Sequence, residues 1–206
     1  MKNSLHKINH LGFFILLFFI GLFTDCKDNK NQDFAYLTSI DINSLSKGTF
    51  NWDEVKNDSV IVFFFLAPDC PMCINYALPI NKLYEQYNEK GIVFIGVYPG
   101  SFYTEDEIGA YVEKYKLPFP MLLDKDFKIT KFVQARITPE VFVLNKNEQI
   151  LYRGKIDDWA VSLSKWKQNI TEHYLADVLD AIAHNQSIKI NNTEAVGCFI
   201  ENYDQE

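Results

Sequence analysis

The chain has 206 residues, of which 48% are hydrophobic, and it includes 17 Phe and 11 Tyr. Such a composition can build a packed core, so disorder is not the expected state. The net charge is −7, and the body of the chain contains no basic run. We therefore expect no nucleic-acid partner, because binding to phosphates requires clustered Lys and Arg.

Residues 1–25 have the pattern of a targeting signal rather than of a folded element. Two early lysines form a positively charged start, and residues 11–23 form an apolar run. A membrane-spanning helix needs roughly 20 residues, so this run is too short to span but suits a signal peptide. We assign residues 26–44 to a tether and lead-in, and residues 45–206 to one domain of ordinary size.

Cys26 stands directly after the apolar run and is followed by a polar stretch, KDNKNQD. This arrangement resembles a bacterial lipoprotein signal, which implies that Cys26 becomes lipidated, although Asp25 stands where that family has a small residue. The alternatives are an ordinary cleaved signal and an uncleaved short anchor. All three place the domain outside the cytoplasm, where disulfides persist. We expect a membrane-anchored lipoprotein facing the periplasm, with a soluble periplasmic protein as the alternative.

The remaining pattern alternates strands and helices. Residues 59–66 are a continuous β-branched and aromatic run, which predicts a strand buried on both faces. A helix is expected over residues 71–90 and a second buried strand over residues 92–98. Further along we expect a helix that begins with a capping box, a short strand, a short helix, a hairpin and a last helix (residues 104–116, 121–123, 126–133, 140–144 with 149–152, and 171–184). This order predicts an α/β fold with a central mixed β-sheet flanked by helices on both faces, its first strands parallel and its hairpin at an edge.

The strongest chemical signal is Cys70-Pro71-Met72-Cys73, between the first buried strand and the helix. A cysteine at a helix N-terminus faces free backbone N–H groups and the positive end of the dipole, and both stabilise a thiolate. Pro71 suits the first helical turn because it has no N–H to leave unpaired. This spacing predicts a redox pair in which Cys70 attacks and Cys73 resolves the mixed disulfide.

Two alternatives to redox chemistry remain for this pair: a permanent structural disulfide or half of a zinc site. A structural zinc site needs four ligands. Cys198 is distant in the sequence, and His173 and His184 lack ligand spacing. We therefore expect no metal at this motif, and the chain shows no phosphate loop or dinucleotide motif that would predict another cofactor.

With these motifs the chain resembles the thioredoxin-like superfamily over residues 45–200, in its extracytoplasmic redoxin branch, related to AhpC/TSA proteins and cytochrome c maturation thioredoxins. The strand–CPMC–helix unit, residues 137–140 (ITPE), and residues 154–158 (GKIDD) together with 197–200 (GCFI) carry the resemblance.

The resemblance implies a thioredoxin-like fold. It also implies that Pro139 is cis and packs against the active-site disulfide. The backbone at Thr138, together with Pro71 and Met72, would then contact the substrate.

Two positions depart from the thioredoxin pattern. Asp69 replaces the tryptophan before the first cysteine, and its charge is expected to raise the pKa of Cys70. Phe64 replaces a buried acid that shuttles protons in thioredoxins. Asp157 and Glu140 are candidates for that proton transfer; otherwise we expect both to lie in a solvated surface or turn.

The function expected from these residues is thiol–disulfide exchange with exported protein thiols or disulfides, and the resemblance favours reduction. A membrane electron donor or acceptor of thiols would recycle the Cys70–Cys73 pair. A peroxiredoxin-type thiol peroxidase is an alternative, although its usual Thr and Pro are Ala67 and Phe63 here. A non-enzymatic copper chaperone is another, since soft thiolates suit Cu(I).

Cys198 has two interpretations. It is either a small buried or idle thiol, or a third redox thiol that relays a disulfide from the Cys70–Cys73 pair.

Overall fold

The computed structural model of the protein describes residues 34–46, 48–55 and 60–201. The expected signal segment and Cys26 lie outside these residues, so the targeting and lipidation hypotheses stay predictions. In the described part, no helix is long and apolar enough to cross a membrane.

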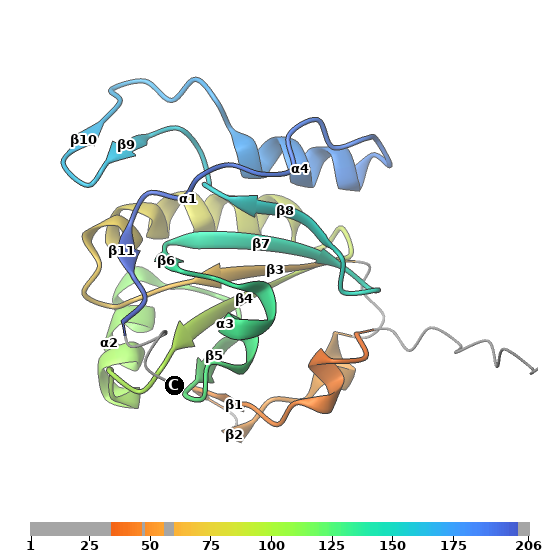
Figure 1. Ribbon diagram of the computed structural model, residues 1–206, viewed down its shortest axis with the longest axis vertical. Coiled ribbons are helices and arrows are strands. Elements are labelled where there is room, and N and C mark those ends of the chain that lie inside the picture. The colour runs from red at the N-terminus through yellow and green to blue at the C-terminus, as the bar shows by residue number, and fades with distance from the viewer. Residues whose placement is uncertain (1–33, 47, 56–59, 202–206) are drawn as a thin grey trace, which may run out of the picture. The chain divides into compact units, whose positions relative to one another are not determined.

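A seven-stranded mixed sheet forms the centre of the domain, as predicted, in the order β2-β1-β5-β4-β3-β7-β8 (Figure 1). Strands β3, β4 and β5 are parallel, whereas β7 runs antiparallel to β3 and pairs with β8 at the edge. The other edge, β1 and β2, was not predicted. The strands are β1 (Asn43–Ser44), β2 (Gly48–Thr49), β3 (Val60–Phe65), β4 (Ile92–Pro99), β5 (Met121–Asp124), β7 (Glu140–Asn145) and β8 (Ile150–Gly154).

Helices cover both faces of this sheet, as the alternating pattern predicted. The capping box at the start of α2 forms as expected, with the Thr104 side chain accepting from the Glu107 N–H and the Glu107 side chain accepting from the Thr104 N–H. The helices are α1 (Pro71–Tyr87), α2 (Glu105–Tyr115), α3 (Lys128–Val133) and α4 (Tyr174–Ala183), with the 3₁₀ turns η1 (Leu37–Ser39) and η2 (Trp52–Glu54).

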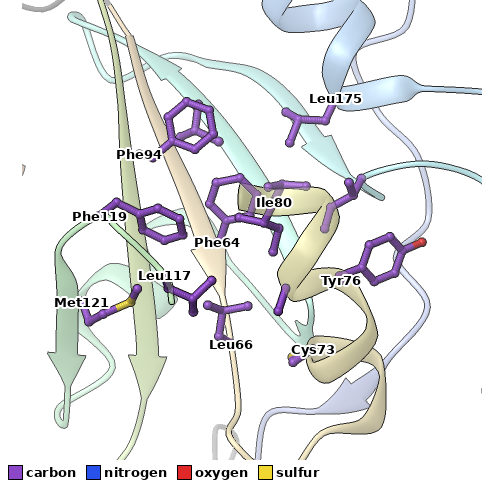
Figure 2. Packing of buried hydrophobic residues seen from close by; sticks show 14 of the residues in the cluster. Phe64, Leu66, Cys73, Tyr76, Ile80, Phe94, Leu117, Phe119, Met121 and Leu175 are labelled. Atoms are coloured by element: carbon purple, nitrogen blue, oxygen red, sulfur yellow. The ribbon is translucent and has the colours of Figure 1, made fainter. Parts of the chain in front are cut away.

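Alternate residues of β3 divide the core into two clusters. Phe64 faces α1, α2 and α4, where it stacks on Phe94 and Phe119 with ring centroids 5.6 and 5.8 Å away (Figure 2). Phe63 and Phe65 face the opposite cluster with α3. Residues 34–44, expected to lead into the domain, contribute Phe34, Leu37 and Ile42 to this second cluster. The aromatic run at the end of β3 is therefore core, as predicted, and its burial fixes where the strand ends and the CPMC motif begins.

Two small strand pairs lie outside the main sheet, and neither was predicted. β9 (Ala160–Ser162) pairs with β10 (Lys165–Trp166) in a hairpin. β6 (Ile137–Thr138) pairs antiparallel with β11 (Cys198–Phe199), which lies beside it in Figure 1. This second pairing attaches the C-terminal tail to the loop that precedes β7.

Candidate active site

Cys70 occupies the N-cap of α1, with Pro71 following at the first helical position, as the sequence predicted. Its side chain is only 1% exposed. In the thiol form, Cys70 Sγ donates a hydrogen bond to the carbonyl of Thr138 at 3.1 Å. The strand β3 and the helix α1 thus hold the sulfur against the loop that leads into β7.

Cys73 lies one helical turn further on and faces the core. It is fully buried in the cluster of Phe64 and Tyr76, at the N-terminal end of α1 (Figure 2). Its Sγ accepts a hydrogen bond from the backbone N–H of Ala67 at 3.4 Å. Both cysteines are free thiols in the structure. Cys73 is therefore placed behind Cys70, away from solvent.

The two thiols differ in acidity because each acts on the other. Hydrogen bonding from the Cys73 side chain, opposed by burial and supported by Cys198, lowers the pKa of Cys70 from 9.0 to about 5. Burial, and then the hydrogen bond and charge of Cys70, raise the pKa of Cys73 well above its ordinary value. The lowered pKa favours the thiolate of Cys70 and the raised pKa keeps Cys73 protonated, which is the arrangement expected if Cys70 attacks and Cys73 resolves.

The loop opposite Cys70 contains a cis peptide bond between Thr138 and Pro139, the isomer that the resemblance implied. Thr138 is 2% exposed, and its carbonyl is the acceptor of the Cys70 hydrogen bond. The substrate-contacting candidates differ in accessibility, because Pro71 is exposed whereas Met72 is 5% exposed and belongs to the core cluster.

Cys198 lies at the same site. It pairs with Thr138 across β6 and β11, and it lines with Cys70 a pocket of about 140 Å³ that Asp69, Phe102 and Tyr103 also border. Burial, followed by the hydrogen bond and charge of Cys70, raises the pKa of Cys198 to about 12. Its side chain is partly exposed, so the structure brings all three described thiols together without burying the third.

A family model described as the AhpC/TSA family matches residues 30–153. The chain belongs to the AhpC/TSA family. The matched range contains the CPMC motif and the cis-proline loop, and it ends before Cys198, so the tail of this AhpC/TSA protein lies beyond the matched range.

Curated relatives of this AhpC/TSA protein carry two kinds of name. A Coxiella burnetii peroxiredoxin, Bcp, is 31% identical over 132 residues, which is 62% of this chain and 82% of that protein. The thiol-disulfide oxidoreductase ResA of Bacillus thuringiensis is 26% identical over 151 residues, 73% of this chain and 84% of that protein.

Solved structures share the fold at low sequence identity. A hypothetical protein from Sinorhizobium meliloti matches with a TM-score of 0.69 and 22% identity, covering 79% of this chain and 90% of that one. A thioredoxin-like protein from Aeropyrum pernix matches with a TM-score of 0.53 and 18% identity, over 71% and 91% of the two chains. The thioredoxin-like fold predicted from the sequence is therefore confirmed.

Asp69 does not produce the net effect expected from its charge. Its carboxylate accepts a hydrogen bond from the hydroxyl of Tyr103. The pKa of Cys70 is lowered rather than raised, because the neighbouring thiols and backbone amides stabilise its charged form. The charge of Asp69 instead contributes to the raised pKa of Cys198.

The two candidates for proton transfer are buried, contrary to the solvated surface or turn expected of them otherwise. Asp157 is 5% exposed and accepts a hydrogen bond from the Tyr76 hydroxyl at 2.7 Å. Glu140 is 4% exposed and forms a 3.2 Å ion pair with Arg153. Each carboxylate thus has a structural partner that explains its burial.

Sequence reasoning missed Phe102 and Tyr103 as residues of the site. They follow β4, which is parallel to β3 and in register with it, so the carboxyl ends of both strands meet at one edge of the sheet. Residues after such strands share a crevice. The sequence did contain a signal for them, because both strands were predicted to be parallel. The residues that follow each strand could therefore have been assigned to the site.

Proposed function

We propose that this chain is a thiol–disulfide oxidoreductase that exchanges electrons with exported proteins through Cys70 and Cys73, acting as a reductant. The observation that carries the exchange chemistry is the pairing of an acidic thiol at the N-cap of α1 with a buried, weakly acidic one behind it. The reducing direction rests on the resemblance to cytochrome c maturation thioredoxins. The chain is an oxidoreductase, in keeping with relatives named thiol-disulfide oxidoreductase and peroxiredoxin.

The reaction follows from this pairing. The Cys70 thiolate attacks one sulfur of a client disulfide, so a Cys70–client bond forms and the first client thiolate leaves. Cys73 then loses its proton and attacks Cys70 Sγ, which forms the Cys70–Cys73 disulfide and releases the second client thiolate. Two electrons have passed to the client, and a membrane thiol donor supplies two more, which reduce the Cys70–Cys73 disulfide again.

The client would be held by the cis-proline side of the site. The exposed ring of Pro71 and the backbone of Thr138 and Pro139 lie on either side of Cys70. Met72 is buried, so it contributes packing beneath the site rather than contact surface. We further propose an extracytoplasmic location and a lipid anchor at Cys26, on the strength of the signal pattern in residues 1–26.

The test is a redox titration of the full chain with Cys26→Ser, so that Cys70, Cys73 and Cys198 are its remaining thiols. The protein is equilibrated in graded thiol–disulfide buffers, alkylated, and each cysteine is assigned by mass spectrometry. We expect Cys70 and Cys73 to titrate together between roughly −120 and −270 mV. A pair that stays oxidised below roughly −300 mV is a structural disulfide, which would overturn the proposal.

A Cys73→Ala variant adds a second measurement. With Cys198→Ala added, so that no resolving thiol remains, it should accumulate a mixed disulfide on Cys70 when mixed with oxidised insulin. A Cys70→Ala variant is the matched control and should form none. Insulin reduction by the wild-type chain, but by neither variant, would support the assigned direction.

Thiol peroxidase activity is the second candidate, favoured by the match to peroxiredoxins. Cys70 would attack one peroxide oxygen to give a sulfenic acid and hydroxide, and Cys73 would displace water to form the disulfide. The hydroxyl that peroxiredoxins place three residues earlier is missing, because Ala67 stands there. Hydrogen peroxide consumption by the reduced chain decides between the two, and rates no faster than free cysteine would exclude this candidate.

A further inference from the structure

The C-terminal tail lies beside Cys70, where Cys198 lines the same pocket. Cys198 pairs with Thr138 across β11 and β6, and the Thr138 carbonyl accepts the Cys70 hydrogen bond. Thr138 is therefore a shared neighbour of both cysteines. The side chain and backbone amide of Cys198 also act as hydrogen-bond donors that favour the charged form of Cys70. Cys70 therefore interacts with two thiols rather than one.

The tail is held in this position by specific contacts along β8. Thr193 accepts a hydrogen bond from the Lys155 N–H at 2.8 Å, and its backbone N–H donates to the Arg153 carbonyl at 3.0 Å. The residue before Cys198 has no room for a side chain, because a Cβ on Gly197 would lie 2.1 Å from the Thr138 carbonyl oxygen. The closeness of tail and loop thus depends on glycine at position 197.

We propose that Cys198 is a second resolving thiol, which attacks mixed disulfides on Cys70 and forms a Cys70–Cys198 disulfide. This rests on the proposed function, since it requires Cys70 to form the mixed disulfide first. Cys198 Sγ attacks Cys70 Sγ, the bond from Cys70 to the client breaks, and the client leaves as a thiolate. The proton of Cys198 passes to solvent, and no outside oxidant is needed.

The two resolving thiols differ in how exposed they are to solvent. Cys73 is fully buried, whereas Cys198 is partly exposed and lines the same pocket as Cys70. A client that reaches Cys70 through this pocket passes Cys198, since Cys70 itself is only 1% exposed. Cys198 therefore meets the mixed disulfide from the side on which the client lies.

The same arrangement lowers the reactivity of Cys198 while Cys70 is a free thiolate. Apart from burial, the hydrogen bond and negative charge of the Cys70 thiolate raise the pKa of Cys198. Both influences end when Cys70 becomes bonded to a client, because a disulfide sulfur carries no charge. The pKa of Cys198 then falls, so its thiolate forms more readily at the stage when Cys70 carries a disulfide for it to attack. Cys73 can afterwards displace Cys198 from Cys70, which gives the Cys70–Cys73 disulfide.

The test uses the full chain with Cys26→Ser and Cys73→Ser, reduced and mixed with one equivalent of dithiobis(nitrobenzoate). Attack by Cys70 releases one thionitrobenzoate, and resolution by Cys198 releases a second. We expect both, with the second release independent of protein concentration, and a Cys70–Cys198 peptide in the mass spectrum. Release of only one, with a stable nitrobenzoate adduct on Cys70, would overturn the proposal.

Two variants of Cys198 in the same background separate attack from positioning. Cys198→Ser keeps a hydrogen-bond donor beside Cys70 but removes the nucleophile, whereas Cys198→Ala removes both. If Cys198 resolves, both variants stop at one release. If Cys198 only stabilises the Cys70 thiolate, Cys198→Ser behaves like its parent in both release and alkylation rate, and the proposal fails.

Failure of this inference is distinguishable from failure of the proposed function. In a chain with Cys73 intact, the Cys70–Cys73 disulfide and insulin reduction still appear if only the role of Cys198 is wrong. If the proposed function is wrong, the chain with Cys73 intact does not reduce insulin and its Cys70–Cys73 pair stays oxidised throughout the redox titration, whatever the Cys198 variants do.

Discussion

Two regions of the molecule, the start of α1 and the C-terminal tail, contact the sulfur of Cys70 in different ways. The start of α1 is continuous with the core, where Cys73 packs among aromatic side chains and is fully buried. The tail around Cys198 is held by a two-residue strand pair and a few hydrogen bonds, and its Phe199 is 78% exposed. The start of α1 is therefore expected to stay folded, whereas the tail around Cys198 opens more readily, since regions with few buried contacts open most readily.

The largest contrast between these regions is expected in stability. Phe64→Ala removes a ring stacked on Phe94 and Phe119 and should cost about 3–5 kcal/mol of unfolding free energy. Phe199→Ala removes an exposed ring and should change it by less than about 0.5 kcal/mol. Denaturant titrations that follow tyrosine and tryptophan fluorescence measure both. Equal losses would mean that the tail is as much a part of the core as β3.

The thiols of the two regions should also differ in how their reactivity depends on pH. With pKa values of about 5 and about 12, Cys70 is ionised at pH 7 and Cys198 is not. The thiolate fraction favours Cys70, but a thiolate of lower pKa is less nucleophilic, so we expect Cys70 to react roughly 10²-fold faster. Iodoacetamide labelling read by mass spectrometry should give a midpoint near pH 5 for Cys70. A midpoint above pH 8 would contradict the stabilised thiolate.

The same shift predicts how the stability of the reduced chain changes with pH. Because the pKa of Cys70 is lowered on folding, the unfolded chain binds more protons between pH 5 and pH 8, and stability rises across this range. It is lost as the pH falls through 5. The disulfide form has no such thiolate and should lack this rise. A stabilised reduced form also makes a couple more oxidising, so the measured potential is a direct test of the reductant assignment.

A smaller effect is expected at the glycine that lets the tail approach. Gly197→Ala places a Cβ against the Thr138 carbonyl and should cost about 1–3 kcal/mol, with Cys198 becoming easier to alkylate. The matched control is Gly109→Ala in α2, where a Cβ meets nothing within 4 Å and should stabilise the helix by about 0.5–1 kcal/mol. If both variants alkylate at the wild-type rate, the tail does not depend on this close approach.

The sequence predicted the first region and not the second, for a physical reason. The run that became β3 and the periodic face of α1 are long enough to carry a repeating pattern, so the place of Cys70 and Cys73 followed from them. β6 and β11 have two residues each, and two hairpins and the helix α4 separate them in the chain. So short a strand has no period, and its pairing depends on packing elsewhere. The position of Cys198 beside Cys70 therefore required the structure, although the Gly197-Cys198 motif had marked the tail as worth testing.

The smallest predicted effect concerns the charge at the mouth of the pocket. Asp69 is exposed, accepts a hydrogen bond from Tyr103, and contributes to the raised pKa of Cys198. Asp69→Asn keeps an acceptor for Tyr103 but removes the charge, so the pKa of Cys198 should fall. An exposed charge is screened, and we expect Cys198 to react only about 1.5- to 5-fold faster at pH 8. Because screening weakens this contribution, the difference between wild type and variant should shrink in high salt. A rate for Cys198 that is unchanged at low salt would show that burial and Cys70, without Asp69, keep this thiol protonated.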